Sequence, residues 1–114
     1  MSRLPAEEKV HELVSAYRRG DFPGAERLAR GFTRKWPAHD LGWNILSASL
    51  HALGKLDKAA NAYRRAIALN PRYAELRDNY GALLIQQGAL EDAGAQFREA
   101  VRLDPGSGRS RANL

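Results

Sequence analysis

The feature that most constrains the fold is a sequence repeat with a period of 34 residues. Moving the sequence along itself by 34 positions superimposes nine identical pairs within one repeat length. These pairs are Ala48 with Ala82, Leu50 with Leu84, Gly54 with Gly88, Leu56 with Leu90, Ala59 with Ala93, Arg64 with Arg98, Ala66 with Ala100, Leu69 with Leu103 and Pro71 with Pro105. A weaker earlier copy shares Gly20, Ala25, Arg30 and Pro37 with the second. We therefore divide the chain into repeat 1 (6–39), repeat 2 (40–73) and repeat 3 (74–107), followed by the truncated start of a fourth (108–114).

Each repeat predicts two amphipathic helices joined at a glycine. Apolar residues recur mostly at spacings of three and four, the period of a helix with one buried face, and strand alternation is absent. The joining glycines are Gly20, Gly54 and Gly88, and the closing prolines are Pro37, Pro71 and Pro105. A left-handed glycine ends the first helix and a proline stops the second. The sequence therefore predicts an all-α fold of stacked helical hairpins, forming a single domain over residues 1–114.

Composition excludes several classes of function. The 114 residues contain no Cys, which removes disulfides, thiolate zinc sites and thiol nucleophiles. No apolar run reaches the roughly 18 residues of a membrane span, and charges occupy the start of the chain, where a signal peptide would be apolar. We therefore expect a cytoplasmic protein that does not insert into membranes.

Charge is distributed unevenly along the chain. The net charge of +5 divides into +3 for residues 1–39 (8 basic, 5 acidic), +3 for residues 40–73 (5 and 2), −3 for residues 74–107 (3 and 6) and +2 for the last seven residues. Arg27, Arg30 and Arg34 follow one helix face and could track phosphates. Aromatic residues are not interleaved with these arginines for base stacking, so nucleic acid is a disfavoured partner.

No set of residues predicts catalysis. Glu8 and His11 have the spacing of a helical metal-ligand pair, but a second such pair is missing. His51 is a lone histidine, more typical of packing or of a groove than of a metal site. We therefore predict no enzyme activity, no cofactor and no metal.

The repeat resembles the tetratricopeptide repeat (TPR) family, most clearly in repeats 2 and 3. Repeat 2 matches the family pattern at Trp43, Leu46, Leu50, Gly54, Ala59, Tyr63, Ala66 and Pro71, and repeat 3 at Tyr80, Gly81, Leu84, Gly88, Ala93, Phe97, Ala100 and Pro105. Arg77 stands in the place of Trp43, and repeat 1 has Lys9 and Glu12 where large apolar residues are usual. Repeat 1 is therefore expected to be a terminal cap, and the resemblance implies a right-handed superhelix.

The resemblance also implies a binding site for an extended peptide in a concave groove lined by the first helices. Carried over by position, the site residues are Val14, Tyr17, Asn44, Ala48, His51, Asp78, Asn79, Ala82, Ile85 and Gln86. Asparagine can donate to and accept from a peptide backbone without selecting a sequence. The alternative is that these are ordinary solvated helix positions.

Two further functions stay open beside a free adaptor or scaffold. Asn79 and Asn113, one repeat apart, resemble the asparagine ladder of the TPR arms of protein O-glycosyltransferases, and bacterial sulfotransferases carry similar arms. The chain would then present substrates to a larger enzyme. In the other alternative the edge after repeat 3 meets a second copy, and the charge pattern favours head-to-tail contact. The carboxylate clamp of chaperone-binding TPR domains is mostly missing, because Val10, Val14 and Ile45 occupy its positions.

Overall fold

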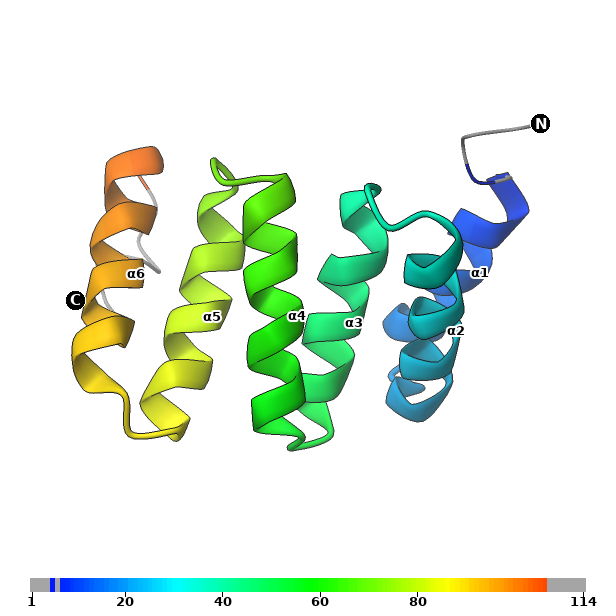
Figure 1. Ribbon diagram of the computed structural model, residues 1–114, viewed down its shortest axis with the longest axis horizontal. Coiled ribbons are helices and arrows are strands. Elements are labelled where there is room, and N and C mark those ends of the chain that lie inside the picture. Colours follow the sequence, from blue (N-terminus) through cyan, green and yellow to red (C-terminus); the bar gives the residue numbers. More distant parts are fainter. Residues whose placement is uncertain (1–4, 6, 107–114) are drawn as a thin grey trace. The chain divides into compact units, whose positions relative to one another are not determined.

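The computed structural model describes residue 5 and residues 7–106, and all regular elements among them are α-helices. In chain order these are α1 (Glu7–Arg18), α2 (Phe22–Lys35), α3 (Asp40–Ala52), α4 (Leu56–Leu69), α5 (Ala74–Gln86) and α6 (Leu90–Leu103). The chain divides into two compact bodies, an N-terminal body (residues 1–69) with α1–α4 and a C-terminal body (residues 70–114) with α5 and α6. Figure 1 shows the helical hairpin of each repeat. The predicted all-α fold of helix-turn-helix units is confirmed, whereas the predicted start of a fourth unit lies outside the described residues.

The turns have the chemistry that the sequence predicts. Gly20, Gly54 and Gly88 have φ values of 77°, 76° and 80°, in the left-handed region that side chains with a Cβ rarely adopt. After α3, the amide of Lys55 donates to the carbonyl of Leu50 at 2.9 Å, the six-residue closure typical of a glycine-ended helix. The helices α2, α4 and α6 each end two residues before the closing proline of their repeat.

Small residues bring paired helices close together. Ala59, Ala66, Ala93 and Ala100 are at most 2% exposed. A Cβ added at Gly81 of α5 would lie 2.5 Å from Cε1 of Phe97 in α6, so the phenyl ring occupies the space that this glycine leaves open. Close approach of the helix axes therefore depends on small residues on one side and a ring on the other.

The closing proline of a repeat also accepts a side-chain hydrogen bond from the helix that follows it. Nε1 of Trp43 donates to the carbonyl oxygen of Pro37 at 2.9 Å. One repeat later, Nε of Arg77 donates to the carbonyl oxygen of Pro71 at 3.0 Å. Although Arg77 departs from the family pattern, it therefore makes a hydrogen bond equivalent to that of Trp43, to the proline of the preceding repeat.

Candidate functional site

A narrow strip of α3 stays open after the helix has packed on its neighbours. This helix contacts α1, α2 and α4, and its buried residues surround most of its circumference. Four half-buried residues follow one line at spacings of three and four: Leu41, Asn44, Ala48 and His51. Asp40 and Trp43 are also half-buried but lie off this line. We call this line the α3 strip. It contains all three of the site residues that the sequence predicts for repeat 2.

The neighbouring helix α1 presents a more apolar line. Val10, Val14 and Tyr17 are half-buried and lie at spacings of four and three. The Tyr17 ring meets Phe22 of α2 edge to face, with ring centroids 5.7 Å apart. Because α1 contacts α3 within the N-terminal body, this α1 strip and the α3 strip belong to adjacent helices.

The Asn44 side chain has a hydrogen-bond acceptor that no described residue uses. Its Oδ1 atom is buried and has no hydrogen-bond partner among the described residues. A buried side-chain oxygen without a partner is uncommon, because it forfeits the hydrogen bond that it made with water. Ala48 lies one turn further along the strip and has a short side chain. Because Oδ1 is buried, it meets a ligand only when the half-buried Asn44 side chain turns outward.

His51 has a structural partner that the sequence did not reveal. Its Nδ1 lies 2.8 Å from the hydroxyl oxygen of Tyr63 in α4, and the two rings meet at 82°. The contact ties the end of α3 to α4, so His51 helps to hold the hairpin together while its ring stays half-buried. The two residues are separated by a turn, and neither spacing nor composition singles out the pair.

The C-terminal body corrects one predicted site residue. Asn79 and Ala82 are half-buried and Ile85 and Gln86 are exposed on α5, but Asp78 is only 2% exposed. The predicted contribution of the Asp78 carboxylate to an open surface is therefore wrong. The reason is that buried residues surround α5 as they do α3; they are Leu76, Asp78, Tyr80, Gly81, Leu83 and Leu84.

The carboxylate of Glu26 joins α2 to the turn between α3 and α4. Its Oε1 accepts a hydrogen bond from Nζ of Lys55 and its Oε2 accepts one from Nε of Arg30, both at 2.8 Å. The bond from Lys55, followed by that from Arg30, lowers the pKa of Glu26 below its usual value of 4.5. A carboxylate whose pKa is lower in the folded state stabilises the fold above its unfolded pKa, and this contribution is lost as the pH falls through the folded pKa.

We expect Glu26→Gln to lower the free energy of unfolding by about 1 kcal/mol at neutral pH, because the amide keeps the shape but loses the charge. The deficit should shrink once the pH falls below 4.5 and vanish when the wild-type carboxylate is protonated. Urea unfolding of both proteins at a series of pH values measures it. Lys55→Met should show the same pH dependence of stability. A loss of unfolding free energy that persists in acid would contradict the assignment of the lowered pKa of Glu26 to this ion pair.

Neither a metal-binding cluster nor a membrane-spanning helix is found among the described residues. Nowhere among residues 5 and 7–106 do three or more His, Asp or Glu side chains gather as a metal site would require. None of the helices in this part of the chain is both long and apolar enough to cross a membrane. The half-buried strips combine aliphatic, aromatic and amide groups, which suit the binding of a polypeptide.

A helical-repeat architecture and a mixed apolar and amide surface define a repeat protein of the interaction class. The tetratricopeptide repeat model matches residues 13–62 and again residues 49–108. The chain belongs to the tetratricopeptide repeat family.

Curated relatives are longer proteins that contain a similar segment. The chain is 39% identical over 77 residues to the cytochrome c-type biogenesis protein CycH of Rhizobium meliloti, which takes in 65% of this chain and 20% of that protein. It is 37% identical over 65 residues to the TPR repeat-containing thioredoxin TTL4 of Arabidopsis thaliana, with 57% of this chain and 10% of that protein covered. The chain thus spans a fifth or less of the length of these relatives.

Solved structures of low sequence identity share the fold. The Yersinia enterocolitica type III secretion chaperone SycD, in complex with a peptide of the translocator YopD, superimposes with a TM-score of 0.88 at 17% identity, over 95% of this chain and 88% of that one. The first TPR of Spaghetti (RPAP3), bound to the HSP90 peptide SRMEEVD, gives 0.86 at 18% identity, over 96% and 90%. The expected resemblance to glycosyltransferase or sulfotransferase arms is not supported by these comparisons, and Asn113 lies outside the described residues.

Proposed function

We propose that this chain is a non-catalytic module that binds an extended segment of a partner protein along the faces of its first helices. In the N-terminal body the bound segment would lie on the α1 and α3 strips. In the C-terminal body, considered by itself, Asn79, Ala82, Ile85 and Gln86 of α5 would contribute. The observation that carries the proposal is the unpartnered, buried Oδ1 of Asn44 on a strip that is otherwise half-buried.

The chemistry of the strips fits a peptide backbone. If the half-buried Asn44 side chain turns toward the ligand, a backbone N–H that donates to its Oδ1 would satisfy an acceptor that lacks a partner among the described residues, which favours the bound state. Ala48 leaves room beside it for main chain to approach. Val14 and Tyr17 supply the apolar contact that adds affinity without demanding a particular ligand residue.

Family membership supports the same function. SycD is described with a YopD peptide and Spaghetti with an HSP90 peptide, and both have this fold. Binding of a polypeptide is therefore within the capacity of the architecture, whereas the ligand has to be found for this chain itself.

We expect Asn44→Ala to weaken peptide binding about fivefold to tenfold, the loss of one hydrogen bond, without lowering the melting temperature. Stability is spared because Oδ1 of Asn44 makes no hydrogen bond within the described structure. Peptides are first selected from a random displayed library on the wild-type protein, and fluorescence anisotropy then measures their affinity for each variant.

Ala48→Arg places a long side chain on the α3 strip and should abolish binding of the same peptides. The matched control is Ala68→Arg, which adds the same charge at an exposed position of α4. Selected peptides that bind Asn44→Ala and Ala48→Arg as tightly as the wild type would show that the ligand lies elsewhere. A fall in melting temperature together with affinity would assign Asn44 a structural role.

A further inference from the structure

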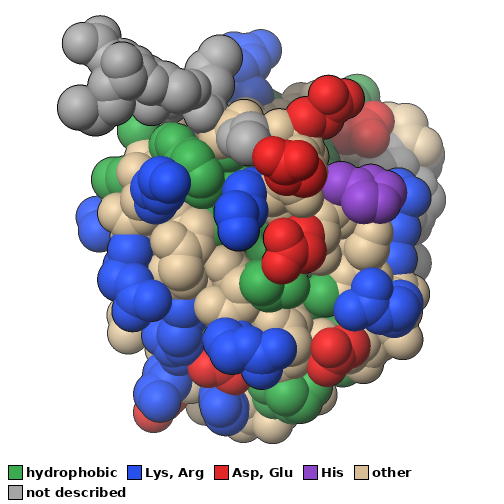
Figure 2. Space-filling view, turned by 90° about the vertical axis from the view of Figure 1, so that its right-hand side faces the viewer, with side chains coloured by type: hydrophobic (Ala, Val, Ile, Leu, Met, Phe, Trp, Pro, Cys, Tyr) green, Lys and Arg blue, Asp and Glu red, His purple; other side chains and the backbone are tan. Residues whose placement is uncertain are grey.

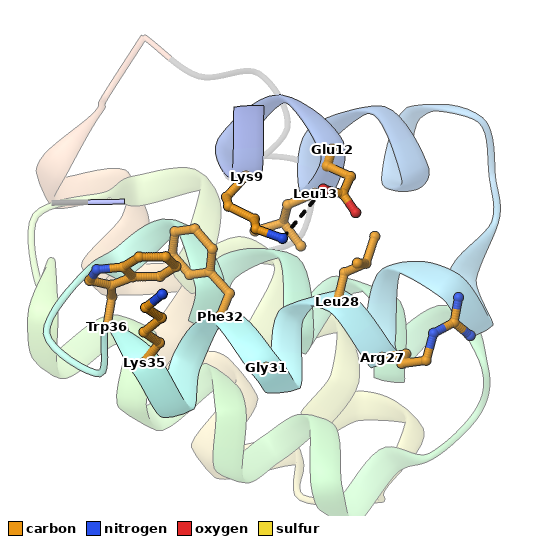
Figure 3. Close-up of a pocket in the computed structure, with 9 residues that line it drawn as sticks. All are labelled: Lys9, Glu12, Leu13, Arg27, Leu28, Gly31, Phe32, Lys35 and Trp36. Carbon is orange, nitrogen blue, oxygen red and sulfur yellow. Dashed lines mark ion pairs between the residues drawn. The ribbon is translucent and has the colours of Figure 1, made fainter. Parts of the chain in front are cut away.

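A hollow of about 310 Å³ opens between α1 and α2, on a part of the N-terminal body separate from the α3 strip. Its apolar lining consists of Leu13, Leu28, Gly31, Phe32 and Trp36. Four exposed charged residues complete it, namely Lys9 and Glu12 from α1 and Arg27 and Lys35 from α2. Figure 3 shows the side chains of α1 and α2 facing each other across this space.

Repeat 2 has a hollow of about 330 Å³ at the equivalent place, but the two hollows are lined by different side chains. Trp43 occupies the position equivalent to Lys9, and Arg65 the position equivalent to Gly31. The Arg65 guanidinium carbon lies 5.0 Å from the centre of the Trp43 ring, and both side chains line the hollow of repeat 2. In repeat 1 a Cβ added at Gly31 would meet nothing within 4 Å. At these two positions repeat 1 therefore has no indole and no guanidinium, although Trp36 and Arg27 line other parts of the hollow.

Positive charge predominates at the opening. Lys9 is 4.0 Å from the Glu12 carboxylate, and Nζ of Lys35 lies 4.9 Å from the centre of the Trp36 ring. Within the described residues, no carboxylate pairs with Arg27 or Lys35. Figure 2 shows this end of the molecule, with Lys and Arg side chains gathered along one side. An apolar side chain accompanied by carboxylates would suit both the lining and the opening.

The C-terminal body carries a segment of that chemistry. Leu90, the first residue of α6, is 67% exposed, against 47% for Ile85, the next most exposed large hydrophobic residue in the described part of the chain. Glu91 and Asp92 follow it in the first turn and are exposed as well. The repeat that contains this turn has a net charge of −3, against +3 for the segment that contains the hollow.

We propose that the hollow between α1 and α2 binds the Leu90–Glu91–Asp92 turn of a second copy of this chain. Leu90 would enter the apolar lining, and the two carboxylates would lie against Arg27 and Lys35. In a head-to-tail contact each added copy leaves one hollow and one turn unoccupied, whereas two copies that exchange their turns reciprocally close a dimer. In either arrangement association rises with concentration.

Sedimentation velocity on the 114-residue chain, from about 10 μM to about 1 mM, tests the proposal, since a contact of this small size implies a weak complex. The average mass of the wild type should rise with concentration and fall back when salt is added. Gly31→Arg, which fills the hollow, and Leu90→Ser, which removes the apolar side chain, should each weaken association at least about tenfold. Gly31→Arg stays folded, because the space is open and arginine favours a helix more than glycine does.

Matched controls and a mixing experiment separate this contact from others. Ala68→Arg and Leu69→Ser make the same kinds of change at exposed positions outside the contact and should associate like the wild type. An equimolar mixture of Gly31→Arg with Leu90→Ser should form a heterodimer that grows no further, because one intact hollow meets one intact turn. A wild-type monomer throughout, association that survives either variant, or a mixture that stays monomeric would overturn the proposal.

Discussion

Replacing Phe97 with alanine is expected to lower the free energy of unfolding by about 3–5 kcal/mol. The ring is 2% exposed and fills the space between α5 and α6 that Gly81 leaves open. Removing it forfeits its burial and leaves a cavity that the short hairpin cannot close. The expected loss is a large part of the 5–15 kcal/mol that is the typical free energy of unfolding of a domain. Urea unfolding followed by circular dichroism measures the loss.

Phe97→Leu serves as the control, since it keeps most of the buried volume and should cost less than about 2 kcal/mol. A loss below about 1 kcal/mol for Phe97→Ala would mean that the ring does not organise the α5–α6 pair as its burial indicates.

Gly81→Ala is expected to destabilise the same pair from the opposite side, by about 1–3 kcal/mol. Its new Cβ would lie 2.5 Å from Cε1 and 2.8 Å from Cζ of Phe97, distances at which the ring or the helix must move. The same substitution in the middle of an ordinary helix is favourable, because alanine favours the helix more than glycine does. Thermal unfolding of the single variants shows which effect prevails.

Gly31→Ala is the matched control for Gly81→Ala. Its Cβ meets nothing within 4 Å, so it should raise the free energy of unfolding by about 0.5–1 kcal/mol. If Gly81→Ala owes its effect to overlap with the ring, combining it with Phe97→Leu should cost less than the sum of the two single changes. Strict additivity, or equal signs for the two glycine variants, would contradict the packing described here.

The helical hairpins were predictable because their signals are local. Apolar residues at helical spacing, a left-handed glycine at each turn and a proline past each second helix lie close together in the sequence. The rarity of Cβ-bearing residues at φ near 77° makes Gly20 a marker of a helix end even in the weakest repeat. Repeats 2 and 3 then repeat the same signals.

The candidate site was less predictable because exposure on a first helix depends on what packs around it. Asp78 and Asn79 are adjacent polar residues, yet Asp78 is 2% exposed and Asn79 is half-buried. The contact of His51 with Tyr63 joins two helices across a turn. In contrast, Lys9 and Glu12 were visible in the sequence as departures from the repeat, and both line the hollow between α1 and α2.

The side-chain hydrogen bonds to Pro37 and Pro71 bear on how repeats of this kind diverge. An indole and a guanidinium share little in size or polarity, yet each ends in a flat group with an N–H that reaches the preceding carbonyl. In this chain the position thus keeps a donor of the right reach although it does not keep the aromatic ring. A tryptophan pattern alone therefore does not describe the residues that can form this junction, since Arg77 forms it without an indole.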